Sequence, residues 1–299
     1  MTNVLTLICN PETATLDTTV ADKYYDALHD AGLRPAAPIW LAAGEAMDLP
    51  FSGSLDTARE TLTPLLQAEA LDYAIQPQAE RRKQLLIADM DSTIIQVECI
   101  DELADFAGLK EKVAAITEAA MRGELDFAAA LKERVSLLKG IDIAVLDRVF
   151  HERVRLTPGA VEMVQTMNKT GAMTILVSGG FTFFTHRVAE ATGFQVNRGN
   201  VLGISNGKLS GEVVPPIVDS STKLNSLIEF RQSSALTPRQ TLAVGDGAND
   251  IPMIQEAGLG VAYHPKPAAA AAADVVIRYG DLTALLYLQG FHKEEFVTA

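Results

Sequence analysis

The stretch IADMDSTIIQVE at residues 87–98 places two aspartates at the end of an apolar run. Leu85 and Leu86 precede it, so the pattern predicts a buried strand that ends in Asp89 and Asp91. Side chains two residues apart on a strand point to the same face. Two like charges about 4 Å apart repel each other by roughly 4 kcal/mol at an effective dielectric constant of about 20. The pair therefore requires a bound cation, a proton on one carboxylate, or a change of backbone direction.

Other apolar runs in the second half of the chain also end in small or acidic residues. Continuous apolar runs that alternate with helical segments are typical of parallel strands buried on both faces. The pattern therefore predicts an α/β fold with a doubly wound parallel sheet, whose ligands bind at the carboxyl ends of the strands. The runs are LLIAD at 85–89, MTILVSGG at 173–180, TLAVGDG at 241–247, GLGVAY at 258–263 and DVVI at 274–277.

Between the first two of these strands, residues 98–155 have no strand pattern. They contain four segments with helical periodicity, which are separated by glycines. We expect a helical cap insertion over about 97–156. Because it directly follows the paired aspartates, it is in a position to cover them.

The first 80 residues have a different pattern. Short apolar strands alternate here with amphipathic helices, which predicts a small α+β unit. The charged stretch AERRKQ at 79–84 separates it from the rest of the chain, so we expect one domain at 1–80 and a second at 84–299. The predicted strands are 4–9, 38–42 and 71–75, the predicted helices are 18–31 and about 54–69, and a predicted loop contains Gly44, Pro50 and Gly53.

Composition argues against several classes of protein. A formal net charge of −13 over 299 residues disfavours a general nucleic-acid binder or a protein of anionic membrane surfaces, because both require a basic face. No apolar stretch has the length needed to span a bilayer, and the start MTNVLTLICNPET lacks the basic region of a signal peptide. Cys9 and Cys99 lie far apart in apolar surroundings, so we expect reduced core residues. We therefore expect a cytoplasmic protein.

Polar groups at three further strand ends and helix starts fit one chemistry. Ser178 and Gly179 in VSGGF precede a predicted helix, whose first N–H groups can hold a phosphate. Lys223 lies in the first turn of another predicted helix, where a cation is electrostatically unfavourable. GDGAND adds the carboxylates of Asp246 and Asp250, which suit a divalent cation. Each group alone also fits an ordinary turn or surface position, but together with the first two aspartates they meet the needs of magnesium-assisted phosphoryl transfer.

In this order, DMDST, VSGG, the downstream lysine and GDGAND resemble the haloacid dehalogenase superfamily of aspartyl-phosphate phosphatases. The resemblance implies that Asp89 is the nucleophile, which forms a phosphoaspartyl intermediate, and that Asp91 is the general acid and base. It also implies that Mg²⁺ is bound by the Asp89 carboxylate, the Asp91 backbone carbonyl and Asp246, with Asp250 supporting the metal shell. The residues that it implies for holding the phosphate are Ser178, Gly179 and Lys223.

Within this superfamily, residues from about 85 to 290 are most similar to the phosphoserine phosphatase group. The resemblance implies that Glu98 binds the amino group of the substrate and that Arg134 binds its carboxylate. A guanidinium binds a carboxylate in bidentate fashion, and a carboxylate suits an ammonium. The implied reaction is the hydrolysis of O-phospho-L-serine to L-serine and phosphate, the last step of serine biosynthesis. The other positions that match substrate contacts of that group are Met121, Phe127 and Asn249.

Other functions fit the same motifs. A related phosphotransferase would pass the phosphoryl group to another hydroxyl, such as that of homoserine, and a related phosphatase would hydrolyse a different small phosphomonoester. An amino-acid-binding regulatory protein is a third interpretation, although no catalytic position of the motifs is replaced. The first 80 residues are similar in their order of elements to ACT-type modules, and we expect them to serve in packing or in a homodimer contact rather than as a ligand sensor.

Overall fold

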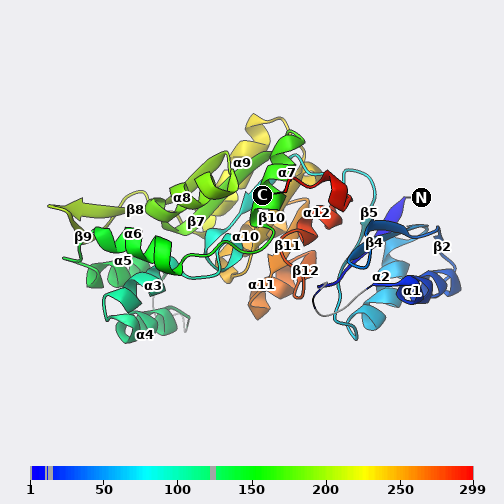
Figure 1. The fold of residues 1–299 in the computed structure, drawn as a ribbon, viewed down its shortest axis with the longest axis horizontal. Coiled ribbons are helices and arrows are strands. Elements are labelled where there is room, and N and C mark those ends of the chain that lie inside the picture. Colours follow the sequence, from blue (N-terminus) through cyan, green and yellow to red (C-terminus); the bar gives the residue numbers. More distant parts are fainter. Residues whose placement is uncertain (1, 11, 13–15, 122–125, 299) are drawn as a thin grey trace.

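The structure, a computed structural model, describes residues 2–10, 12, 16–121 and 126–298. Within those residues the larger sheet has seven strands in the order β12-β11-β10-β6-β7-β8-β9 (Figure 1). Neighbouring strands run parallel except for β8 and β9, which form an antiparallel hairpin. The strands are β6 (Leu85–Ala88), β7 (Met173–Phe181), β8 (Val196–Ser205), β9 (Lys208–Val214), β10 (Thr241–Gly245), β11 (Leu259–Tyr263) and β12 (Val275–Ile277).

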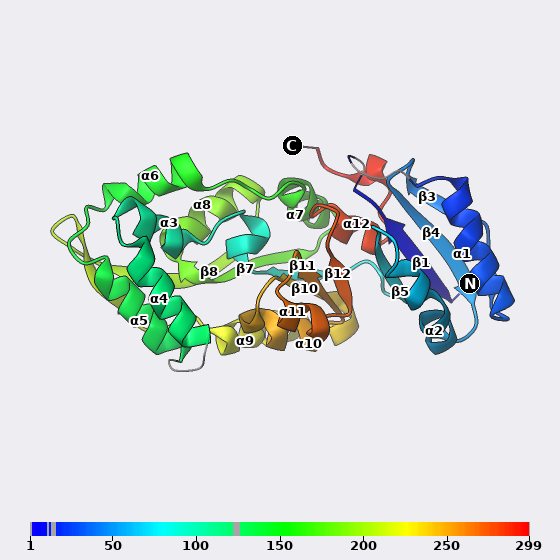
Figure 2. The same ribbon diagram turned by 90° about the horizontal axis from the view of Figure 1, so that it is seen from below.

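Helices cover both faces of this sheet (Figure 2). They are α7 (Ala160–Lys169), α8 (Thr182–Thr192) and α12 (Ala284–Leu288) on one face, and α9 (Ser220–Ser233), α10 (Ile251–Glu256) and α11 (Pro267–Ala272) on the other. In β6, Leu86 and Ala88 belong to the core on the α7 side, whereas Leu85 and Ile87 belong to the core on the α9 side. This burial on both faces confirms the predicted fold class, while the β8–β9 hairpin was not predicted.

An insertion that contains the helices α3, α4, α5 and α6 lies between β6 and α7. An isolated bridge between Ile95 and Leu156 holds the start and the end of this insertion together. The helices lie on the side of the molecule away from the N-terminus, and α5 packs against β9 (Figures 1 and 2). They are α3 (Cys99–Phe106), α4 (Lys110–Met121), α5 (Phe127–Leu137) and α6 (Ala144–Arg153).

The residues before β6 form a smaller antiparallel sheet. Its strands are β1 (Asn3–Ile8), β2 (Arg34–Pro35), β3 (Ile39–Ala42), β4 (Ala46–Ser52) and β5 (Asp72–Pro77). The order is β2-β4-β1-β5, and β3 also pairs with β4. Two helices, α1 (Thr18–Asp30) and α2 (Leu55–Leu66), cover one face of this sheet, where Tyr24 and Leu28 pack in one core with Leu5 and Leu49. We call residues 2–77 the N-terminal region.

Strand β4 corrects the expectation of a loop around Gly44, Pro50 and Gly53. Residues 46–51 pair with β1, and Ser52 pairs with Arg34 of β2. Pro50 lies between the positions that pair with β2 and those that pair with β3, and its carbonyl accepts a hydrogen bond from the N–H of Ala36. A proline has no N–H, so it is tolerated where no ladder bond from its nitrogen is needed. The gap between β2 and β3 provides that position.

A buried aspartate joins the smaller sheet to the larger one. Asp72, the first residue of β5, is 1% exposed. Its carboxylate accepts hydrogen bonds from the backbone N–H groups of Arg278 at 2.7 Å, Tyr279 at 3.1 Å and Gly280 at 2.7 Å. Consecutive N–H groups form a concave anion site. The Asp72 carboxylate therefore holds β5 next to the segment that directly follows β12.

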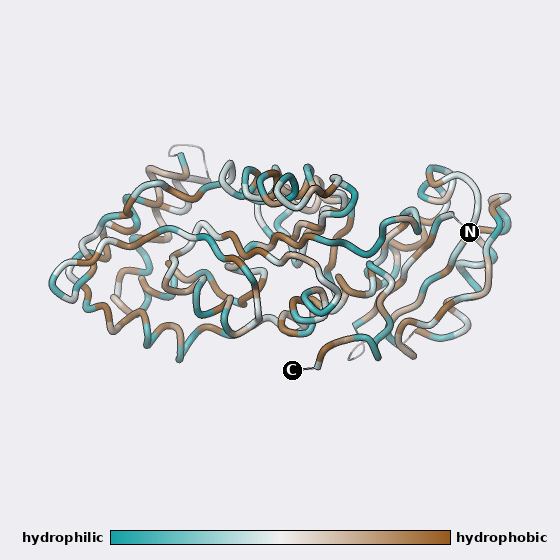
Figure 3. Tube along the Cα trace, turned by 90° about the horizontal axis from the view of Figure 1, so that it is seen from above, coloured by the Kyte–Doolittle hydropathy of each residue, from teal (hydrophilic) through white to brown (hydrophobic). Residues whose placement is uncertain are grey.

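Arg81 adds a second tie from the connecting segment, which is a mostly hydrophilic stretch between the two parts of the chain in Figure 3. Its guanidinium pairs with Asp48 of β4 at 2.6 Å and donates to the hydroxyl of Thr6 at 2.9 Å. It also donates to the carbonyl of Leu288 in α12 at 3.3 Å. Asp48 and Thr6 belong to the N-terminal region and Leu288 belongs to α12. Arg81 therefore links the N-terminal region to α12.

Helix length and cysteine burial bear on the expectations from composition. The longest described helix, α9, has 14 residues. Across the described ranges, no helix combines the length and the apolar character that a membrane span requires. Cys9 and Cys99 are both buried thiols, as predicted.

Asp72→Asn is expected to weaken the contact between β5 and the segment after β12. An amide offers one acceptor oxygen and turns an NH₂ group toward backbone donors, which leaves buried N–H groups unsatisfied. We expect the free energy of unfolding, measured by urea denaturation near neutral pH, to fall by about 1–3 kcal/mol. Asp56→Asn, at an exposed position of α2, is the matched control. Equal free energies of unfolding for the two variants would contradict the docking role of Asp72.

Candidate active site

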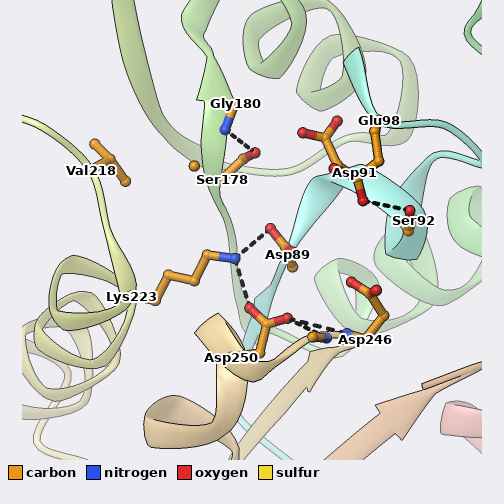
Figure 4. Close-up of polar contacts among 12 residues, drawn as sticks. Asp89, Asp91, Ser92, Glu98, Ser178, Gly180, Val218, Lys223, Asp246 and Asp250 are labelled. Atoms are coloured by element: carbon orange, nitrogen blue, oxygen red, sulfur yellow. Dashed lines mark hydrogen bonds and ion pairs between the residues drawn. The ribbon is translucent and has the colours of Figure 1, made fainter. Parts of the chain in front are cut away.

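Polar side chains meet in a cavity at the carboxyl ends of β6, β7 and β10 (Figure 4). The cavity has a volume of about 360 Å³, and helices α4 and α5 form part of its wall. Strand ends of a parallel sheet are the expected place for a ligand. The predicted site residues in its wall are Asp89, Asp91, Glu98, Phe127, Arg134, Ser178, Gly179, Asp246 and Asn249.

Lys223 and Asp250 do not line this cavity, but Lys223 lies directly beside Asp89 with its side chain 1% exposed (Figure 4). Its ammonium lies 2.6 Å from Oδ1 of Asp89 and 2.6 Å from Oδ1 of Asp250. Burial disfavours the ammonium, but the two carboxylates outweigh this effect and raise the pKa of Lys223 above its ordinary value. Burial raises the pKa of Asp89 well above its ordinary value, and the negative charge of Asp250 adds to the shift. Lys223 therefore stays charged and holds two chain segments together.

The two aspartates of the first motif do not share a strand face, which corrects the first expectation. Strand β6 ends before Asp89, and a single helical turn over Met90–Ile94 follows, in which Ser92 has a left-handed φ of 56°. Asp89 faces Lys223, whereas Asp91 accepts a hydrogen bond from the N–H of Cys99 at 3.4 Å. The repulsion between the carboxylates is thus relieved by a change of backbone direction and by a buried ammonium.

The environment of Asp91 suits a group that exchanges a proton. Burial, followed by the nearby charge of Glu98, raises the pKa of Asp91 to about 7. The hydroxyl of Ser92 donates a hydrogen bond to Oε1 of Glu98 at 2.7 Å. The residue next to Asp91 therefore orients Glu98, so this short segment arranges both carboxylates.

A bulge in β7 forms another wall of the cavity. The pairing register between β7 and β8 shifts over residues 178–180, which we call the β7 bulge. The N–H of Gly180 donates a hydrogen bond to Oγ of Ser178 at 2.8 Å. A Cβ at Gly180 would lie 2.7 Å from Oδ2 of Asp91. The bulge therefore passes directly beside this carboxylate, a constraint on Gly180 that the S-G-G pattern did not reveal.

The loop after β10 brings Asp246 and Asp250 to the site. Oδ2 of Asp250 accepts hydrogen bonds from the N–H groups of Asp246 at 3.2 Å and Gly247 at 3.0 Å, so it orders the loop as well as pairing with the lysine. Lys266, which was not predicted, lies in the cavity wall with its Nζ 3.0 Å from Oδ2 of Asp246. Its position shortly after the end of β11 is the sequence signal that could have found it.

Three buried carboxylates could hold a metal ion. One oxygen from each of Asp89, Asp246 and Asp250 lies within 4.8 Å of the others. Oδ1 of Asp89 is within ion-pair distance of Lys223, but it has no partner with hydrogen-bond geometry among the described residues. Hard divalent cations prefer oxygen ligands, and three carboxylates supply such ligands together with compensating charge. The donor set therefore fits Mg²⁺.

The cap forms the wall opposite these carboxylates. Glu98 directly precedes α3, and Phe127 and Arg134 lie on α5. Burial lowers the pKa of Arg134, and nearby carboxylates oppose this shift. Nε of Arg134 donates to the carbonyl of Ala130, and no described carboxylate lies within ion-pair distance of the guanidinium. Arg134 thus retains donors for a bound anion. Met121 ends α4, and its side chain lies outside the described part of the structure.

The same residues match a known family. The family model described as haloacid dehalogenase-like hydrolase matches residues 86–255, which include the three motifs that end β6, β7 and β10. The protein belongs to this hydrolase family. A phosphoserine phosphatase of Polaromonas sp. (strain JS666) is 49% identical to this hydrolase over 210 residues, which are 69% of this chain and 89% of the relative.

Solved structures resemble the hydrolase over nearly its whole length. A probable phosphoserine phosphatase from Vibrio cholerae has a TM-score of 0.77 at 33% identity, with 97% of this chain and 86% of that chain covered. A haloacid dehalogenase family hydrolase from Salmonella enterica serovar Typhi has a TM-score of 0.83 at 28% identity, with 96% of this chain and 98% of that chain covered. The similarity therefore includes the N-terminal region.

Gly180→Ala is expected to impair hydrolysis without unfolding the enzyme. The new Cβ would displace the Asp91 carboxylate, which is the movable end of a side chain, so the cost to stability is small. A misplacement of about 1 Å at a reacting group can lower the rate about 100-fold, and we expect kcat/KM for phosphomonoester hydrolysis to fall by about that factor. The melting temperature serves as the control. Full activity of a folded Gly180→Ala variant would show that Asp91 need not lie where the structure has it.

Proposed function

We propose that this hydrolase is a Mg²⁺-dependent phosphatase that converts O-phospho-L-serine into L-serine and phosphate, the last step of serine biosynthesis. The arrangement of the cavity carries the proposal: Asp89 lies beside the buried ammonium of Lys223 at one end, and Glu98 and Arg134 lie on the cap at the other. Phosphoserine has a phosphate at one end and an amino acid at the other. The name of the Polaromonas relative supports the same substrate.

In this proposal Asp89 is the nucleophile. A carboxylate oxygen of Asp89 attacks the phosphorus, the bond between phosphorus and the seryl oxygen breaks, and a phosphoaspartyl intermediate forms. Asp91 gives its proton to the departing seryl oxygen. It then takes a proton from the water that attacks the intermediate, which releases phosphate and restores Asp89. A pKa of about 7 for Asp91 suits both proton transfers.

The phosphate would be held where the β7 bulge faces the buried lysine. The donors proposed for it are the hydroxyl of Ser178, the backbone N–H of Gly179 and the ammonium of Lys223. The proposed holders of Mg²⁺ are the Asp89 carboxylate, the Asp91 backbone carbonyl and Asp246, with Asp250 supporting them. When bound, the cation neutralises charge that would otherwise oppose the approach of a carboxylate to a phosphate dianion.

The cap would select the amino-acid end of the substrate. The carboxylate of Glu98, oriented by Ser92, accepts hydrogen bonds from the ammonium group of the substrate, and Arg134 donates hydrogen bonds to the substrate's carboxylate. Phe127 extends over the β7 bulge, since a Cβ at Gly179 would lie 3.0 Å from its ring. Asn249 lines the cavity beside the metal ligands.

Phosphate release over a panel of phosphomonoesters tests the proposal. With Mg²⁺ present, we expect O-phospho-L-serine to have the highest kcat/KM. Release should stop when EDTA removes the metal and resume when Mg²⁺ is restored. Asp89→Asn is expected to lower kcat at least about 1000-fold, because it removes the nucleophile.

Three results of this experiment would reject parts of the proposal. A preference for another ester would reject the substrate. Transfer of the phosphoryl group to added homoserine in place of phosphate release would reject the hydrolysis of phosphoserine as the reaction. Unchanged turnover by Asp89→Asn would reject the nucleophile.

Arg134→Ala tests how the carboxylate of the substrate is recognised. Truncating one partner of a buried charge pair typically costs about 2–5 kcal/mol, so we expect kcat/KM for phosphoserine to fall at least about 30-fold. Turnover of p-nitrophenyl phosphate, which has no carboxylate, should change less than about threefold. Lys132→Ala removes an exposed cation from the same helix and is the matched control. Equal losses on both esters would contradict the carboxylate contact.

A further inference from the structure

A fully buried amide connects two walls of the phosphate end of the cavity. Asn200 of β8 is 0% exposed. Its Nδ2 donates hydrogen bonds to the carbonyl of Gly179 at 2.8 Å and to the carbonyl of Val218 at 3.1 Å, and its Oδ1 accepts one from the N–H of Val218 at 2.8 Å. Both N–H bonds of the amide are thus in use. Asn200 is neither in the cavity wall nor in any motif of the sequence.

The first of these partners belongs to the β7 bulge. A bulge takes residues out of the strand ladder and leaves backbone groups that need other partners. The Asn200 side chain supplies that partner for Gly179. The backbone beside it is equally constrained, because a Cβ at Gly199 would lie 3.2 Å from the carbonyl oxygen of Gly180. Strand β8 therefore fixes the bulge through both a side chain and a close backbone approach.

The second partner leads directly to the buried lysine. Val218 precedes Asp219, whose side chain caps α9 through the N–H of Thr222 at 2.9 Å. The N–H of Lys223 in turn donates to the backbone carbonyl of Asp219 at 3.1 Å. The first turn of α9 is thus a rigid link between Val218 and the ammonium that lies against Asp89 (Figure 4).

We propose that Asn200 is a positioning residue that sets the distance between the β7 bulge and Lys223, and thereby the shape of the phosphate-binding end of the site. The inference rests on the proposed function, in which both groups hold the phosphate. A buried amide with a purely structural role would stabilise the fold without a selective effect on phosphate. A positioning role predicts that changes at Asn200 weaken the binding of phosphate at one end of the cavity more than the binding of L-serine at the other end. A purely structural role predicts no such difference.

Two variants of Asn200 separate these roles. Asn200→Asp keeps the shape and the acceptor for the N–H of Val218 but presents an oxygen to two carbonyls. Asn200→Ser is too short to bridge the two segments. For either variant we expect the KM for phosphoserine and the inhibition constant of inorganic phosphate to rise about tenfold, since a small misplacement of binding groups has large effects. The inhibition constant of L-serine, which reports on the cap, should change less than about twofold.

Asn168→Asp and Asn168→Ser are the matched controls. Asn168 also bridges two segments, because its Nδ2 donates to the carbonyl of Gly193 at 2.7 Å and its Oδ1 accepts from the hydroxyl of Thr174 at 2.8 Å. It lies on α7, outside the cavity wall. These variants are expected to lower the melting temperature and to leave both inhibition constants unchanged.

Each result decides the matter. A folded Asn200 variant with an unchanged inhibition constant for phosphate overturns the inference, as do equal shifts for phosphate and L-serine. Failure of both variants to fold assigns Asn200 to stability alone and also overturns it. If the parent enzyme releases no phosphate from any ester, the proposed function fails and this inference fails with it. An active parent with unaffected Asn200 variants overturns the inference alone.

Discussion

An ammonium buried between two carboxylates is the constraint on which the site depends. Moving a charge out of water costs several kcal/mol per ion unless partners compensate for it, so Lys223 can be buried only if Asp89 and Asp250 meet it there. The end of β6, the first turn of α9 and the loop after β10 must therefore converge. The parallel pairing of β6 with β10 provides this, and a shift in its register would leave a charge unpaired in the core. Because buried carboxylates outnumber this ammonium, the same cluster also favours a divalent cation.

The helices and strands whose sequence pattern fits only one kind of element were predictable from the sequence. Strands β6, β7, β10, β11 and β12 are continuous apolar runs, and the cap helices keep a helical period between glycines, so both patterns have a single interpretation. Strand β4 was missed because a proline such as Pro50 usually argues against a strand. Only the structure shows that the nitrogen of Pro50 lies at the gap between β2 and β3, where no ladder bond is needed. The β8–β9 hairpin was missed because its strands are only partly buried and carry polar residues such as Asn197 and Arg198.

The sequence singled out charged groups that follow a strand, such as Asp89 and Asp246, or that begin a helix, as Lys223 does, and the structure brings them together. The groups that were missed act through contacts with distant parts of the chain. Lys266 matters because it reaches Asp246, and Gly180 because a carboxylate lies against it. The prediction that Asp89 and Asp91 share a strand face was wrong for a related reason. Strand β6 ends at Ala88, so the two-residue alternation of a strand does not extend to these aspartates. Local sequence patterns indicate which residue types lie at strand ends. The distances between residues of different segments can be known only from the folded structure.

The docking of Asp72 also places the N-terminal region against one edge of the larger sheet. Strand β12 is an edge strand, and an open edge offers unpaired N–H and C=O groups to a strand of another molecule. The N-terminal region lies against this edge, because Asp72 occupies the N–H groups that directly follow β12 (Figure 2). Helix α5 packs against β9 at the opposite edge. A region that supplies none of the proposed site residues thus lies where another strand would otherwise be able to add to the larger sheet.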